Sequence, residues 1–165
     1  MKTTKNVALG GMLAATALVI MCLGGLIPFA TFVCPALCIL ILQMVLQFTN
    51  RRIGGAWYGA VSILCILLAP DKEAAAVFVC LGYYPLVKPT FEKWPLSFLW
   101  KLVLFNSVIL VMYWALIHLF GMTYLQSEYT EMGNIMLAIL LALGNVTFLL
   151  LDKLLTRVSY LIKKR

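Results

Sequence analysis

Long apolar runs separated by short polar segments make up most of the chain. An α-helix needs about 20 mostly apolar residues to cross the roughly 30 Å hydrocarbon core of a bilayer. By this length test we predict six transmembrane helices, over residues 7–27, 32–48, 53–69, 73–87, 96–120 and 132–151. The fourth is short for a full crossing, and a re-entrant or strongly tilted segment is an alternative for it.

The first apolar run, residues 7–27, follows Lys2 and Lys5, as the apolar core of a secretory signal peptide would. The run is long enough to cross the bilayer, and no small-residue cleavage site follows a short apolar core. We therefore expect a retained transmembrane helix.

The composition of the chain is that of a membrane protein. Its 165 residues are 64% hydrophobic and 12% charged, and the mean hydropathy is +1.01. Soluble proteins average about 45–50% apolar and about 25% charged residues, so the chain departs from them in both respects. No linker, low-complexity tract or repeat interrupts it. We predict an all-α integral membrane protein, a single bundle of six transmembrane helices over residues 1–165.

The basic residues lie on one side of this arrangement. Of the thirteen lysine and arginine residues, all except Lys72 fall on the side that carries both termini. Cytoplasmic segments are rich in Lys and Arg, so we predict that both termini are cytoplasmic. The net charge of +7 then reflects topology and attraction to anionic lipid of the bilayer, and it does not indicate a nucleic-acid partner.

Asp71, Lys72 and Glu73 stand between two apolar runs at the predicted outer surface. They form either a solvated turn, in which Asp71 caps the next helix, or part of a binding site. A predicted outer loop at residues 121–134 brings further polar and aromatic residues to the same surface. Our candidate substrate-binding residues are Asp71, Glu73, Tyr113, Trp114, His118, Tyr124, Glu128 and Asn134.

The charge of the ligand stays open at this point. The outer carboxylates suit a cationic or hydrogen-bonding group, whereas Lys72 favours an anionic one. The aromatic side chains, Tyr113, Trp114 and Tyr124, suit a flat ring.

Polar residues inside the predicted spans are few. The asparagine and glutamine residues, among them Asn106 and Asn145, either bond between helices or line a polar site. Asp152, at the inner boundary of the sixth span, is expected to be a solvated residue paired with Lys153 or Arg157.

Motifs for catalysis and for cofactors are absent from the sequence. There is no His-Glu-x-x-His zinc motif, no Gly-x-Ser-x-Gly elbow and no glycine-rich phosphate loop. The five cysteines fall inside predicted spans, and Cys34 and Cys38 are not spaced as C-x-x-C. His118 is the single histidine, and we interpret it as an interfacial hydrogen-bonding group. We therefore expect no enzyme activity, no cofactor and no metal.

The stretch "KNVALGGMLAATALVIM" resembles the first helix of the substrate-binding S components of energy-coupling factor (ECF) transporters. The chain length, the six predicted spans, the cytoplasmic termini and the basic inner face are also similar to that family. The family's small-residue pattern corresponds here to Gly10-x-x-x-Ala14 and Gly11-x-x-x-Ala15. The signatures of thiamine, riboflavin and biotin binders are not found in this chain.

The resemblance implies a bacterial cell-membrane protein that captures a vitamin or other micronutrient from outside. It would dock on a membrane coupling subunit driven by two cytoplasmic ATPases, through Ala8, Gly11, Ala14 and Ala15. At about 100° per residue these small residues share one face of the first helix, and that face alternatively packs against another helix of the same chain. The alternative function is that of a structural or assembly protein of the cell envelope without transport activity.

Overall fold

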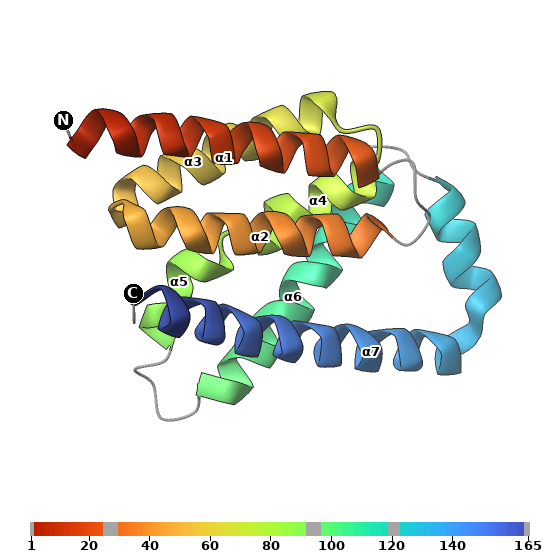
Figure 1. The fold of residues 1–165 in the computed structure, drawn as a ribbon. Helices are drawn as coiled ribbons and strands as arrows, with labels where there is room; N and C mark the ends of the chain where they lie inside the picture. The colour runs from red at the N-terminus through yellow and green to blue at the C-terminus, as the bar shows by residue number, and fades with distance from the viewer. Residues whose placement is uncertain (1, 25–29, 92–96, 119–122, 164–165) are drawn as a thin grey trace.

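The computed structural model describes residues 2–24, 30–91, 97–118 and 123–163 (Figure 1). These residues form seven helices and contain no strand, which confirms the predicted all-helical class. The helices are α1 (Lys2–Gly24), α2 (Ala30–Phe48), α3 (Arg51–Leu68), α4 (Lys72–Leu81), α5 (Tyr84–Phe91), α6 (Ser97–His118) and α7 (Thr123–Lys163).

Five stretches of the described helices are long and apolar enough to cross a bilayer. They are Val7–Gly24, Thr31–Phe48, Arg51–Leu68, Lys72–Phe91 and Phe98–His118. Large apolar side chains are exposed along them, as expected where lipid is the solvent. The described residues therefore indicate a multi-pass membrane protein. Residues 132–151, the sixth predicted span, lie inside α7.

The stretch predicted as the fourth span, residues 73–87, is broken into α4 and α5. The break consists of Gly82 and Tyr83, and Pro85 just after it lacks the backbone N–H that would continue the hydrogen-bond ladder. The hydroxyl of Tyr58 on α3 donates a hydrogen bond to the carbonyl of Val79, near the end of α4. A helix break at membrane depth is tolerated where a neighbouring helix bonds the backbone in this way.

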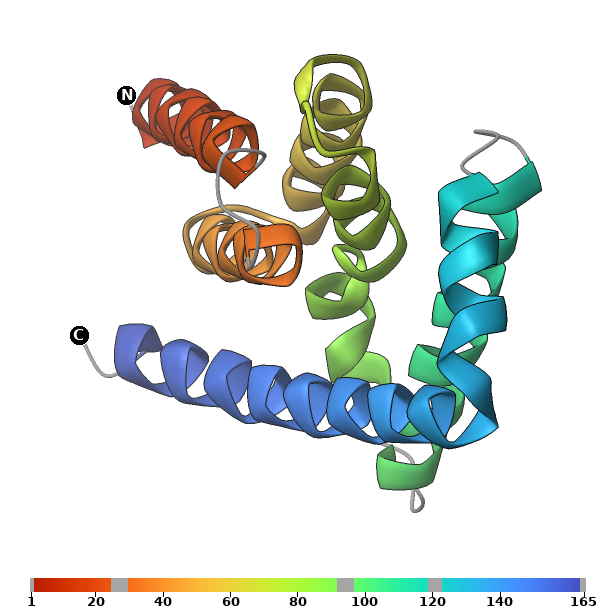
Figure 2. The same cartoon turned by 90° about the vertical axis from the view of Figure 1, so that its right-hand side faces the viewer.

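The central helix of the fold is α2 (Figure 1). It contacts α1, α3, α4, α5 and α7, while α6 packs against α4 and α7. The buried side chains of Ile39 and Leu42 on α2 meet Met21 of α1 and Phe78 of α4 in the core. Figure 2 shows that α7 bends in its first half, so that its first part runs beside α6 and its remainder passes α2.

The helix α7 begins at Thr123, and residues 123–134 are therefore helical. The prediction of an outer loop over residues 121–134 is wrong for this part of the chain. The stretch contains no proline, and Leu, Gln and Glu within it favour a helix. Polar residues interrupt the apolar pattern here, but they do not end a helix that has water or polar headgroups around it.

Candidate functional site

The carboxylates of Asp71 and Glu73, at the start of α4, both make hydrogen bonds to other helices. The backbone N–H of Ala74 donates to Asp71 Oδ1 at 3.0 Å, and the hydroxyl of Thr31 donates to Asp71 Oδ2 at 2.8 Å. Asp71 is therefore the N-cap of α4, as the sequence predicted. The hydroxyl of Tyr113 on α6 donates to Glu73 Oε1 at 2.9 Å. The structure thus brings Asp71 and Glu73 to the N-terminal end of α4 and Tyr113 of α6 beside Glu73.

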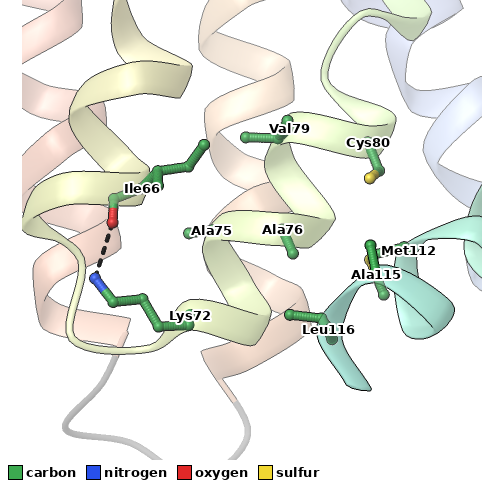
Figure 3. Close-up of a pocket in the computed structure, with 9 residues that line it drawn as sticks. All are labelled: Ile66, Lys72, Ala75, Ala76, Val79, Cys80, Met112, Ala115 and Leu116. Atoms are coloured by element: carbon green, nitrogen blue, oxygen red, sulfur yellow. Dashed lines mark hydrogen bonds between the residues drawn. The ribbon is translucent and has the colours of Figure 1, made fainter. Parts of the chain in front are cut away.

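An apolar groove of about 160 Å³ lies beside these residues, between α3, α4 and α6 (Figure 3). Its lining includes Ile66 of α3, Ala75, Ala76 and Val79 of α4, and Met112 and Leu116 of α6. Two alanines stand where larger side chains would fill the space between the three helices. Sequence reasoning missed these residues because small apolar side chains are ordinary packing residues in membrane helices.

Lys72 is the charged side chain that lines the groove, and Figure 3 places it at one end, with Cys80 at the other. Its ammonium donates to the carbonyl of Ile66 at 2.8 Å and to that of Ala69 at 3.0 Å. Both carbonyls belong to the C-terminal end of α3, where a cation also complements the helix dipole. The ammonium is therefore held at the C-terminal end of α3, and the lining of the groove is almost wholly apolar.

The other candidate residues are placed differently. Trp114 is 59% exposed and stacks on His118, with ring centroids 5.0 Å apart and an interplanar angle of 18°. Both rings lie on the exposed side of α6 and do not line the groove. The side chains of Tyr124, Glu128 and Asn134 lie outside the part of the chain that the structure describes.

A buried ionic network joins α5, α6 and α7 through Asp152. Its Oδ1 accepts from the hydroxyl of Tyr84 at 2.6 Å and from Lys88 Nζ at 2.6 Å. Its Oδ2 accepts from Lys101 Nζ at 3.0 Å. Lys88 and Lys101 are only 6% and 8% exposed. The expectation that Asp152 is solvated and paired with Lys153 or Arg157 is therefore wrong, because helices distant in sequence bring two lysines to it.

The charge state of Asp152, which follows the last predicted span, is set by these neighbours. Burial alone would raise the pKa of its carboxyl. Hydrogen bonds from Lys88, Tyr84 and Lys101 outweigh burial and hold the pKa below its ordinary value of 3.8. The carboxylate is ionised at neutral pH and accepts all three bonds.

Polar contacts continue along one face of α7, on which Asp152, Thr156 and Ser159 are spaced by four and three residues. Lys88 Nζ donates to Thr156 Oγ1 at 2.6 Å, and the amides of Gln43 and Gln47 on α2 donate to Ser159. Three other helices, α2, α5 and α6, therefore make polar contacts with α7 between Asp152 and Ser159.

Nearer the middle of α6 and α7, the side chains of Asn106 and Asn145 bond to each other at 3.0 and 3.2 Å. The expected interhelical hydrogen bonding of the amide side chains is thus observed.

The small-residue face of α1 divides into a packed part and an open part. The indole N–H of Trp57 donates to the carbonyl of Gly10 at 2.9 Å, and Ala17 is fully buried. Ala8, Gly11 and Ala15 are exposed, and Ala14 is half-buried. A Cβ atom added to Gly11 would meet no other atom within 4 Å. The other helices of the chain therefore leave most of the candidate docking residues uncovered.

The chain matches no known protein-family model, no curated protein and no solved structure. Within the described ranges, no group of three His, Cys, Asp or Glu side chains is placed to hold a metal ion. The features of the molecule that bear on function are the groove, the ionic network and the open part of α1.

Proposed function

We propose that this chain is the substrate-capturing membrane subunit of an ECF-type uptake transporter for a vitamin or other micronutrient in a bacterial cell membrane. The observation that carries the proposal is the open small-residue part of α1, at Ala8, Gly11 and Ala15. Small side chains let a second helix approach closely, and such packing is a main source of helix association in lipid. A surface of this kind suits a membrane coupling subunit.

In this proposal the two ends of the molecule have separate roles. The outer groove, beside Glu73 and Tyr113, receives the substrate. The coupling subunit docks on the inner half of α1, and two cytoplasmic ATPases supply the energy. Apolar walls with a few placed polar groups are typical of small-molecule sites.

The proposal requires six crossings with both termini in the cytoplasm. In a variant whose native cysteines are replaced, a cysteine at position 72 should react with an impermeant maleimide added to intact cells. A cysteine at position 52 should react only after permeabilisation, because Arg52 lies with Arg51 in the basic first turn of α3. Labelling of position 52 from outside would contradict this topology.

Docking on α1 is tested by enlarging its open residues. Gly11→Leu should fold normally, because the space around Gly11 is empty, yet the yield of coupling subunit that co-purifies with it should fall at least tenfold. Ala15→Leu should act in the same way.

The matched control for docking is Cys22→Leu, which enlarges an exposed residue in the outer half of the same helix. It should co-purify as the unchanged chain does. Normal co-purification of the Gly11 and Ala15 variants would refute docking through this surface.

A further inference from the structure

The exposed face of α7 joins an apolar stretch to two basic side chains. We propose that this face binds one molecule of an anionic phospholipid, with an acyl chain along the apolar stretch and the phosphate on Lys153 and Arg157. The inference goes beyond the proposed function. It rests on the sixth predicted crossing, residues 132–151, and not on transport.

The apolar stretch has the length of one leaflet of a bilayer. Leu143, Val146 and Leu150 are each more than half exposed. Ten positions separate Leu143 from Lys153 in the continuous helix. At 1.5 Å per residue this is about 15 Å, half of the roughly 30 Å hydrocarbon core. An acyl chain can therefore lie along the stretch when its head group is level with Lys153.

The two basic side chains at the end of this stretch are free to meet a phosphate. Lys153 and Arg157 are one helical turn apart, and both are exposed. Among the residues that the structure describes, neither side chain has an ion pair or a hydrogen bond. The adjacent acid, Asp152, is instead bonded to the lysines of α5 and α6. A phosphate would accept charge-assisted hydrogen bonds from both free cations.

The basic side chains of α7 continue its apolar face, which general attraction between basic residues and anionic lipid does not require. At about 100° per residue, an arc of roughly 120° contains all the exposed residues that form this face. They are Leu143, Val146, Leu150, Lys153, Leu154, Arg157 and Tyr160.

The part of α7 near its C-terminal end has α2 on one side and no described helix on the opposite side (Figure 2). Arg52 of α3 is also exposed, but Ala56 and Gly59 follow it on its face and offer an acyl chain little surface. The combination of free cations with a long apolar stretch therefore distinguishes α7 from the start of α3.

The test measures lipid binding to the purified whole chain by native mass spectrometry. Phosphatidylglycerol and phosphatidylcholine with the same acyl chains are titrated in competition. Each basic side chain near a membrane surface strengthens the attraction of anionic lipid about fivefold. We therefore expect the first phosphatidylglycerol to bind at least tenfold more tightly than phosphatidylcholine. Equal affinities would overturn the proposal.

Substitutions distinguish this site from attraction to the total charge of the protein. Lys153→Gln combined with Arg157→Gln should remove the preference and leave the affinity for phosphatidylcholine unchanged, whereas Lys153→Arg combined with Arg157→Lys should keep it. Arg157→Gln alone should weaken phosphatidylglycerol about fivefold. Its matched control, Arg52→Gln, should have no effect. Equal losses in these two single variants would refute a site on α7.

A crosslinking measurement locates the acyl chain and separates the lipid from another occupant. Phosphatidylglycerol with a diazirine in its acyl chain should crosslink to residues 143–154, and the double glutamine variant should lose this product. Crosslinks only to other helices would overturn the placement. If the chain is instead a dimer that Leu150→Trp separates, and it retains no phosphatidylglycerol, the face is an interface between two copies and the proposal is wrong.

Discussion

Asp152→Asn should lower the thermal midpoint of the purified protein by on the order of 10 °C. The substitution leaves Lys88 and Lys101 buried without the carboxylate that both contact. Removing one partner of a buried ion pair typically costs about 3–5 kcal/mol, because the remaining charge is not compensated. In a chain of this size each kcal/mol corresponds to about 2–4 °C. The midpoint is measured by the loss of the monodisperse peak on size exclusion after heating.

Two variants test whether the lower midpoint of Asp152→Asn is caused by the loss of the carboxylate charge beside the buried lysines. Lys153→Met removes an exposed neighbour of Asp152 and should leave the midpoint nearly unchanged. Combining Lys101→Met with Asp152→Asn should recover part of the loss, because one buried ammonium is removed with its acceptor. If Asp152→Asn alone melts as the unchanged chain does, the network does not stabilise the fold.

The same network makes the stability of the unchanged protein depend on pH in the acid range. The folded pKa of Asp152 lies below its ordinary value, so the stability it contributes is complete above the ordinary value of 3.8. That contribution is lost as the pH falls through the lowered folded pKa. The Asp152→Asn variant lacks this part of the acid dependence, which provides a second readout from the same melting experiment.

Much of the fold was predictable because the bilayer imposes a length on each helix. The apolar runs predicted four long apolar helices, α1, α2, α3 and α6, and a further apolar stretch that the structure divides into α4 and α5. Asp71 predicted the start of α4. These features are local, since a run of apolar residues or an N-cap depends on neighbours in sequence. The amide pair of Asn106 and Asn145 followed from the cost of an unbonded polar group in lipid.

The ionic network was not predictable in the same way. Tyr84 and Lys101 reach Asp152 from 68 and 51 positions away in sequence, so only the packing of α5, α6 and α7 brings them together. The sequence did contain a signal, since Lys101 lies within the predicted fifth span, where a charge is costly unless it is paired. Counting Lys101 only among the basic residues on the side of the termini leaves this signal unused.

Of the candidate site, only the polar residues near the groove were predictable from the sequence. Tyr113 bonds Glu73 in the first turn of α4, and Asp71 caps the same turn. The groove nearby is lined by side chains such as Ala75, Ala76 and Met112. Alanine and methionine carry no chemical signature of a ligand site, and their arrangement depends on how α6 crosses α4. A sequence reveals where polar groups concentrate, but not where helices leave a space.

Gly82→Ala should lower the thermal midpoint by several degrees. The glycine has ordinary right-handed helical backbone angles, so alanine meets no backbone strain there. An added Cβ would instead lie 2.8 Å from Tyr58 Cε2 and closer still to the carbonyl oxygen of Phe78. Tyr58 is held by its hydrogen bond to Val79, and overpacking of this kind typically costs about 1–3 kcal/mol.

Gly59→Ala is the matched control for Gly82→Ala, because it makes the same change inside α3 with nothing within 4 Å of the new Cβ. Alanine is favoured over glycine in a helix by about 1 kcal/mol, so this variant should raise the midpoint. A lower midpoint for Gly82→Ala together with a higher midpoint for Gly59→Ala would show that close packing against Tyr58 and Phe78 requires glycine at position 82, in the break between α4 and α5. A rise in both variants would mean that the joint between α4 and α5 has room for a side chain, and that its glycine is not required for the break.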